Sequence, residues 1–372
     1  MPSRLARLSA SPTEQCPIPA FNPSSPLSPR DSLEQTRSRG CSDTEGPSSQ
    51  DLIYFDFTKI DYELERARKL GSGLWSNVYM SEPTLSRPQP VPGRLTPPYS
   101  PRASISASTA VFAIKVPARK DANVVLRHEA KMLSHLQSFA GMSQYVVPFF
   151  GLDGRNDALV FEAVIGGSMH DLSNRLRHMT DFARHQEVVS IFPGLAMDLI
   201  SALEFMHDAG VVHADIKPQN VLLDVSDHYS LPAPVIRARF IDFSAAFIPS
   251  IEDSMPAGAG TWDYMAPEQI SIQKDLSKPT FASDVWSLGI TLLSVIVLGS
   301  PYTAACGSNL FMLREAVKSG NPIGFAKIDL KVKERMDACQ SFIDCCRLAL
   351  QKDRVKRTTA GAWKRWLEAH DV

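Results

Sequence analysis

Apolar residues change their spacing near the middle of this sequence, and the change predicts two kinds of secondary structure. From Pro193 onward apolar residues recur mostly at helical spacing, and the same spacing earlier predicts a helix over Val124–Leu136. Short apolar and β-branched runs predict strands at Tyr62–Leu70, Asn77–Met80, Val111–Val116, Tyr145–Phe150 and Ala158–Val164. A strand-rich first part followed by a helix-rich second part predicts an α+β fold with two lobes.

Two proline-rich stretches interrupt this pattern. Residues 1–50 hold 8 of the 27 prolines and residues 81–110 hold 7. Neither stretch carries enough periodic apolar residues to offset the entropy of ordering the chain. We therefore predict a disordered tail over 1–50 and one domain over 51–372, with a disordered insertion at 81–110 between two of its strands.

Charge and cysteine content narrow the class of protein further. The formal net charge is −1, which argues against a nucleic-acid partner bound by bulk charge. The longest near-apolar run, Leu288–Leu298, is too short to cross a bilayer, so no membrane insertion is expected. None of the six cysteines lies in a CxxC pair, so we interpret them as reduced thiols of a cytoplasmic or nuclear protein.

A glycine pair is the first candidate for chemistry. Gly71-Ser72-Gly73 lies between two expected strands, after Leu70 and before Ser76. Glycines in such a turn let backbone N–H groups approach phosphate oxygens without a side chain in the way. Taken alone, the motif is better explained by an ordinary hairpin than by a phosphate-binding loop.

A lysine and a glutamate form the second candidate. Lys115 lies at the end of an expected strand, and Glu129 follows 14 residues later on the expected helix. A lysine on a central strand is costly unless its ammonium meets anions. Nucleotide phosphates and the Glu129 carboxylate would supply these anions. For this motif alone, the favoured explanation is a surface lysine on an edge strand and a solvated glutamate on the helix.

The third candidate is the most specific. Asp215, Lys217 and Asn220 lie between apolar residues in the sequence VHADIKPQNVLL, and Asp242 follows Asn220 by 22 residues. A charged surface turn does not account for three polar functions at this spacing. Further along are GTWDYMAPE at 260–268, DVWSLG at 284–289 and Arg357.

These signatures occur in the order and at the spacings of one family. From about residue 55 to 370 the sequence resembles the eukaryotic protein kinases, of serine/threonine type. The resemblance implies a bilobal fold with a small strand-rich lobe and a large helical lobe. It also implies ATP and Mg²⁺ as cofactors and a protein as substrate.

The resemblance also implies roles for single residues. Asp215 would accept or orient the proton of the attacking hydroxyl, Lys217 would steady the transferring phosphoryl group, and Asn220 and Asp242 would hold magnesium. Lys115 would bind the α- and β-phosphates and pair with Glu129. Glu162 and Val164, just after Phe161, would offer backbone hydrogen bonds to adenine. The remaining nucleotide-binding residues would be Leu70, Gly71, Ser72, Gly73, Ser76, Val78, Ala113 and Leu222.

Three positions depart from the family pattern. Ala214 replaces the arginine before the catalytic aspartate, Ser244 replaces the glycine after Asp242-Phe243, and Ser76 replaces a glycine of the loop. None of them removes a phosphate- or metal-contacting group. The sequence therefore favours an active serine/threonine kinase, with a weak or inactive kinase-fold scaffold as the alternative. A small-molecule kinase is disfavoured because the APE triplet and its arginine partner are present.

Overall fold

The computed structural model describes residues 52–85, 111–226, 235–251, 260–270 and 277–370. The predicted tail over 1–50 lies outside these residues, as does 86–110 of the predicted insertion.

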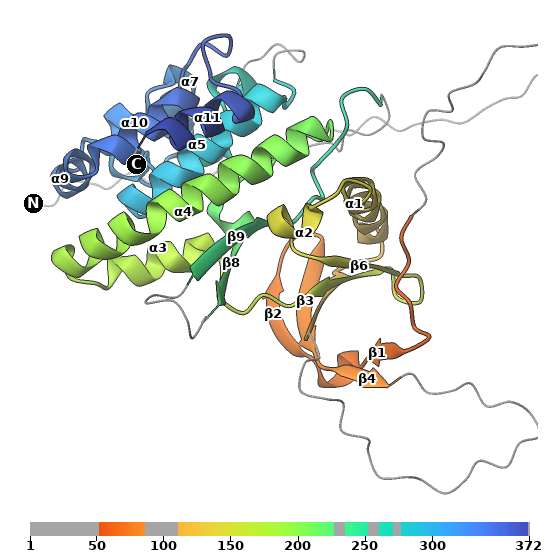
Figure 1. The fold of residues 1–372 in the computed structure, drawn as a ribbon. Coiled ribbons are helices and arrows are strands. Elements are labelled where there is room, and N and C mark those ends of the chain that lie inside the picture. The colour runs from red at the N-terminus through yellow and green to blue at the C-terminus, as the bar shows by residue number, and fades with distance from the viewer. Residues whose placement is uncertain (1–51, 86–110, 227–234, 252–259, 271–276, 371–372) are drawn as a thin grey trace, which may run out of the picture. The chain divides into compact units, whose positions relative to one another are not determined.

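A five-stranded antiparallel sheet forms the first lobe (Figure 1). Residues of β-branched and aromatic type alternate inward along its strands, as at Phe112 and Ile114, which are buried. Helix α1 (Ala122–Gln137) packs on the sheet through Leu126 and Leu133, two residues of its apolar face. The strand order is β2 (Arg68–Ser72), β3 (Ser76–Ser81), β5 (Phe112–Pro117), β7 (Ala158–Glu162) and β6 (Phe149–Asp153).

A second, two-stranded sheet joins β1 (Ile60–Tyr62) to β4 (Pro83–Leu85). Part of the expectation for residues 81–110 is therefore wrong, because Ser81 ends β3 and 83–85 form a strand. The expected single strand over Tyr62–Leu70 is also interrupted, by a 3-10 helix at Leu64–Arg66. Proline is tolerated in β4 because the strand lies at a sheet edge.

The expected strand at Tyr145–Phe150 begins later than predicted. Residues Met142–Tyr145 form the short helix α2, and β6 starts only at Phe149. Gly141, with φ of 85°, starts this helical turn in a conformation that glycine adopts without strain.

The second lobe is helical and is built around α5 (Phe281–Val297), whose side chains are nearly all buried. A capping box at Thr280 and Ser283 begins this helix. Around it lie α3 (Met169–Arg177), α4 (Asp181–Asp208), α6 (Thr303–Cys306), α7 (Leu310–Ser319), α8 (Pro322–Ala326), α9 (Leu330–Ala338), α10 (Gln340–Ala349) and α11 (Ala360–Ala369), with the hairpin β8 (Val221–Ser226) and β9 (Val235–Phe240) and 3-10 turns at Pro218–Asn220, Trp262–Tyr264 and Pro267–Ile270. This arrangement confirms the predicted α+β fold with a strand-rich and a helical lobe.

Helix α4 has a longer apolar stretch than the run considered in the sequence. By length and composition alone it is long enough to cross a membrane. Half of its most apolar window is buried, and the helix packs against α5, α11 and β9. Packing in the core of the large lobe accounts for its apolar composition.

A close helix contact in this lobe gives a test of the packing. A methyl group added at Gly289 of α5 would lie 2.8 Å from Ala349 Cβ and 3.0 Å from Leu350 Cδ2. We expect Gly289→Ala to lower the free energy of unfolding by about 1–3 kcal/mol, as overpacking does. Gly194→Ala in α4 is the matched control, because nothing lies within 4 Å of the added methyl. The control should be neutral or stabilise by up to about 1 kcal/mol through helix propensity. Urea denaturation measures both, and equal effects would contradict the close contact.

Candidate active site

A cavity of about 490 Å³ is lined by residues of both lobes. Strands β2, β3 and β5 line one side of the cavity, and β8 with the two residues after β9 lines the other. The connection after β7 joins the two sides. Every nucleotide-binding residue predicted from the sequence lines it, namely Leu70, Gly71, Ser72, Gly73, Ser76, Val78, Ala113, Lys115, Glu162, Val164, Asn220, Leu222 and Asp242.

The glycine turn forms the end of the β2–β3 hairpin. Gly73 N donates to Ser76 O at 2.8 Å, which closes the turn. A methyl group added at Gly71 would meet nothing within 4 Å, and one at Gly73 would lie 3.8 Å from Ser76 O. The glycines are therefore not required by protein packing, and they leave backbone on this cavity wall open to a ligand.

Lys115 lies at the inner end of the cavity between two carboxylates. Its Nζ is 2.9 and 2.7 Å from the two Glu129 oxygens and 2.8 Å from Asp242 Oδ1. Strand β5 and helix α1 bring the first two together, and the segment after β9 supplies the third. Lys115, its predicted partner Glu129 and the predicted metal ligand Asp242 thus meet at one point.

Burial and these charges act against each other. Burial alone would lower the pKa of Lys115, but Asp242 and Glu129 hold that pKa above its ordinary value. Burial would raise the pKa of Asp242, yet the Lys115 ammonium keeps it below its usual range. For Glu129, burial outweighs Lys115 and raises the pKa. Asp242 therefore stays ionised at neutral pH, as a metal-binding carboxylate requires.

The backbone around Asp242 is held in an unusual conformation. Asp242 has φ of 63°, in the left-handed region that non-glycine residues rarely adopt. Phe243 N donates to Glu129 Oε1 at 3.2 Å, and the Phe243 ring is fully buried. The Ser244 side chain adds a hydrogen bond to Asp242, so this departure from the family pattern supports the aspartate in its present position.

Asp215 does not line the cavity but lies in a small hydrogen-bonded group beside it. Lys217 Nζ is 2.6 Å from Asp215 Oδ2, and Thr261 Oγ1 donates to Asp215 Oδ1 at 3.1 Å. Lys217 also donates to Thr261 at 3.1 Å, and Asn220 Nδ2 donates to Asp215 O at 2.9 Å. Thr261 therefore contacts both Asp215 and Lys217.

Asp284 of α5 braces the loop that carries Asp215. Its two oxygens accept from the backbone N–H groups of His213 and Ala214, at 2.7 and 3.0 Å. Ala214 has φ of 64°, and these two hydrogen bonds stabilise that conformation.

The surroundings of Ala214 are apolar. It is buried in a small cluster with Val212, Ala245 and Phe247. Val212 and Phe247 exchange two backbone hydrogen bonds of 2.9 Å, which tie the segment after Asp242 to the loop. Where the family has an arginine, this protein has hydrophobic packing.

Some cavity residues were not predicted from the sequence. Val147 and Met80 line the cavity, and so does Ile241. Strand parity could have indicated Met80, which lies two residues beyond Val78, and Ile241 directly precedes Asp242. Val147 lies between α2 and β6 and has no comparable signal.

Comparison with known proteins agrees with the fold. The family model "Protein kinase domain" matches residues 102–367, which is more than half of the chain. The chain belongs to the eukaryotic protein kinase family.

The chain is also similar to several curated kinases. It is 30% identical over 213 residues to Citron rho-interacting kinase of Rattus norvegicus, covering 55% of this chain and 9% of that protein. It is 29% identical over 159 residues to MAP kinase-interacting serine/threonine-protein kinase 1 of Xenopus tropicalis, covering 41% and 35%. Serine/threonine-protein kinase RUNKEL of Arabidopsis thaliana is 34% identical over 146 residues, covering 39% and 9%. The chain thus matches only about a third or less of the length of these relatives.

The ion pair between Arg357 and Glu268 anchors the segment beside the site. Its two hydrogen bonds measure 2.8 and 3.1 Å, and the Arg357 side chain is fully buried. We expect Glu268→Ala to lower the free energy of unfolding by about 3 kcal/mol, because it leaves a buried charge without its partner. Glu315→Ala, which removes an exposed pair with Lys318, should cost less than about 1 kcal/mol. Chemical denaturation of both variants measures the difference, and similar losses would show that the buried pair is not an anchor.

Proposed function

We propose that this protein transfers the γ-phosphoryl group of ATP to serine and threonine hydroxyls of a protein substrate. The observation that carries the proposal is the joint contact of Lys115 with Glu129 and Asp242 at the inner end of the cavity. A single ammonium between these carboxylates is what a site needs in order to position phosphates beside a metal-binding group.

Each residue of the site would have a separate role in the reaction. Lys115 would bind the α- and β-phosphates, and Lys217 would donate to the transferring group as its negative charge shifts. Asp215 would orient the attacking hydroxyl and accept its proton, while the new P–O bond forms and the bond to the ADP oxygen breaks. The hydrogen bonds from Lys217 and Thr261 already orient the Asp215 carboxylate, so little reorganisation is needed.

Asp242 and Asn220 would hold Mg²⁺ through side-chain oxygens, the ligand type that this cation prefers. When bound, the metal would neutralise charge on the phosphates. Among the described residues no group of three or more His, Cys, Asp and Glu could form an all-protein metal site. A pair of oxygen ligands fits a cation that takes its other ligands from water and phosphate.

The preference for serine and threonine rests on two residues. In the family, serine/threonine kinases carry a lysine two residues after the catalytic aspartate and a threonine before the APE triplet. Lys217 and Thr261 occupy these positions and contact Asp215 and each other. The named serine/threonine kinases among the relatives support the same assignment.

A catalytically weak or inactive scaffold is the second candidate. Ser76, Ala214 and Ser244 favour it, since each departs from the family pattern. Against it stand the complete catalytic set and the ionised Asp242 in contact with Lys115.

The first test removes single catalytic groups. We expect Asp215→Asn and Lys115→Met each to lower kcat/KM by about a hundredfold or more, because each removes a transition-state interaction. Lys131→Met is the control, since this lysine is exposed on the same helix that carries Glu129. A radiolabelled ATP assay measures the rates, and thermal melting checks that each variant is folded. Equal trace activity in the wild type and both variants would favour the scaffold.

The second test concerns activation. Because Ala214 offers no guanidinium and packs in an apolar cluster, a phosphate on the segment from 243 to 268 would lack its usual bidentate partner. We therefore expect phosphatase treatment and Ser250→Ala to leave the rate of phosphorylation unchanged within about twofold. Ser254, a second serine of this segment, lies outside the described residues. A loss of activity on phosphatase treatment would contradict this expectation.

A further inference from the structure

A segment that precedes the glycine turn runs across the small lobe. We name residues Leu52–Tyr62 the N-terminal strap; they lie before the 102–367 matched by the family model. Leu152 N donates to Ile53 O at 2.9 Å, and Phe55 N donates to Leu152 O at 3.0 Å. The strap therefore pairs in parallel with β6, the last strand of the five-stranded sheet.

Strand β6 is shaped to receive this strap. A methyl group at Gly151 would lie 2.5 Å from Phe55 N and 2.5 Å from Tyr54 C, too close for any side chain. Gly151 also has φ of 134° and follows a bulge in the pairing of β6 with β7. The strap backbone therefore passes so close to β6 that only glycine fits at position 151.

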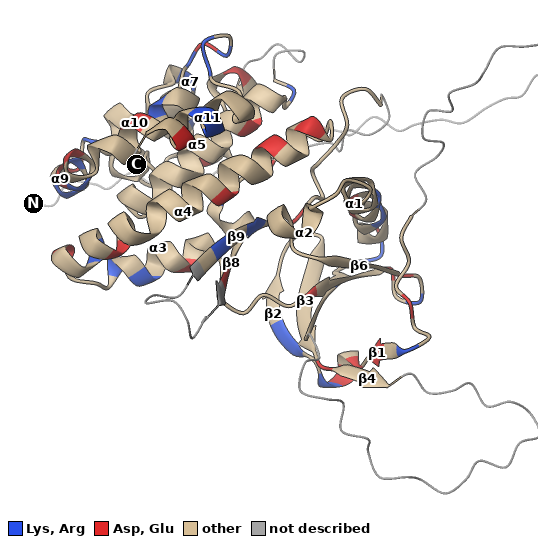
Figure 2. Cartoon of the chain, in the orientation of Figure 1, with Lys and Arg blue, Asp and Glu red and all other residues tan. Residues whose placement is uncertain are grey.

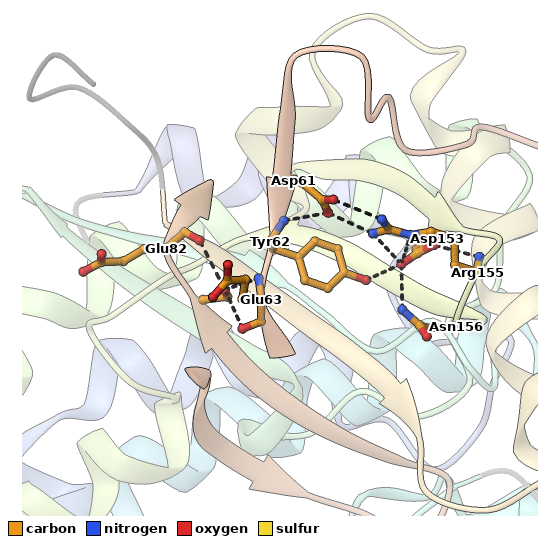
Figure 3. A network of polar contacts seen from close by, with 8 residues as sticks. Asp61, Tyr62, Glu63, Glu82, Asp153, Arg155 and Asn156 are labelled. Carbon is orange, nitrogen blue, oxygen red and sulfur yellow. Dashed lines mark hydrogen bonds and ion pairs between the residues drawn. The ribbon is translucent and has the colours of Figure 1, made fainter. Parts of the chain in front are cut away.

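A polar cluster holds the other end of the strap (Figure 3). Arg155 contacts both Asp61 and the fully buried Asp153, at 2.9 and 3.1 Å, and Tyr62 Oη donates to Asp153. The Arg155 guanidinium also lies 3.5 Å from the centre of the Phe57 ring.

Aromatic packing lies between these two attachment points. The Phe55 ring lies 5.7 Å from that of Phe112 on β5 and 4.8 Å from that of Phe57. The strap is thus attached through backbone pairing, ring packing and charge.

The strap also contacts α1, the helix that carries Glu129. Ile53 N donates to Ser134 Oγ at 3.0 Å, and Ser134 lies five residues after Glu129 on this helix. Leu52 and Ile53 pack against the buried cluster that includes Leu133. The strap therefore connects α1 to β6.

The segment after β9 contacts α1 at other residues. His128 Nε2 lies 2.7 Å from Ala246 O, and Phe243 N donates to Glu129. Two segments distant in sequence, the strap and the segment after β9, thus both contact α1.

We propose that the N-terminal strap is a positioning element that keeps Glu129 in contact with Lys115, acting through Ile53, Ser134 and α1. Its effect on the rate rests on the proposed phosphoryl transfer, whereas its effect on α1 does not. Loss of the strap contact would let α1 move and weaken the Glu129 contact, so turnover would fall without any change in a group that touches the substrate.

The first experiment uses neighbouring residues of the strap in the full chain. Ile53 packs inward, whereas Tyr54 is 58% exposed, so Ile53→Ser and Tyr54→Ser form a matched pair. Amide hydrogen exchange is measured over α1 under conditions where thermal melting shows both variants folded. We expect faster exchange in α1 for Ile53→Ser and wild-type exchange for Tyr54→Ser.

A second pair covers the case in which Ile53→Ser does not fold. Gly151→Ala places a methyl group against the strap backbone, and Ser134→Ala removes only the acceptor of the Ile53 N–H. Gly141→Ala is the control for Gly151, because its φ is also positive, at 85°, and the nearest atom lies 3.9 Å away. Only the first two should speed exchange in α1.

The second experiment asks whether the strap acts through Glu129. We expect Ile53→Ser to lower kcat by between about 5-fold and 150-fold, the usual range for coupling between sites. In a Glu129→Gln background, where the ion pair is already lost, the same change should have little further effect. A merely structural role would lower the melting temperature in both backgrounds and would not produce this dependence.

The outcomes separate the two proposals. If the wild type transfers phosphate but Ile53→Ser lowers kcat equally with and without Glu129, or leaves α1 exchange unchanged, the strap proposal is overturned. If the wild type transfers no phosphate, the proposed function has failed. In that case exchange in α1 alone decides the strap proposal, which stands if Ile53→Ser or Gly151→Ala loosens the helix and falls if neither does.

Discussion

Lys115 carries a charge that is costly to bury, and the arrangement of the cleft follows from how that charge is satisfied. An unpaired ammonium in a protein interior loses far more hydration energy than packing returns. Glu129 and Asp242 supply the opposite charge from two separate elements, α1 and the segment after β9. Each carboxylate would be a costly buried anion without Lys115, so strand, helix and segment are held to a common position by one set of contacts.

The large lobe uses charge in a related way, with α5 as the common support. Asp284, on α5, accepts from the backbone of the loop that carries Asp215. Arg357 donates to Ala282 O at the start of α5 and to Glu268. Helix α5 therefore supports both the loop that carries Asp215 and the segment that carries Thr261. Around them, Figure 2 shows acidic and basic residues interspersed along the helices of this lobe, in keeping with the net charge of −1.

The sequence was most informative where a polar residue would be costly without a function. Asp215, Lys217 and Asn220 lie between apolar anchors, and this contrast could be recognised without coordinates. The resemblance to the protein kinases predicted the lining of the cavity, including Val78, Ala113 and Leu222. The distances between these groups could not be predicted, because they depend on how two lobes distant in sequence pack together.

Errors in the sequence analysis came from pairing between distant residues. The contact of β1 with β4 joins residues 60–62 to 83–85, and proline in the second strand suggested disorder instead. At Tyr145–Phe150 the apolar run was too short to separate a strand from a helical turn leading into one. The strap was not predicted because it depends on pairing between Ile53 and Leu152, which lie almost one hundred residues apart. The available signal was Gly151, a glycine in the middle of a strand.

The pairing of the strap with β6 also covers part of the edge of the five-stranded sheet. A sheet whose last strand is open presents a row of backbone N–H and C=O groups on which a second chain can add, and natural proteins avoid such templates for aggregation. Here Ile53 and Phe55 engage the backbone of Leu152, and Gly151 brings the covering chain into direct contact with the strand. The N-terminal strap thus covers the outer edge of β6 at Leu152, where these backbone groups are paired within the protein's own chain.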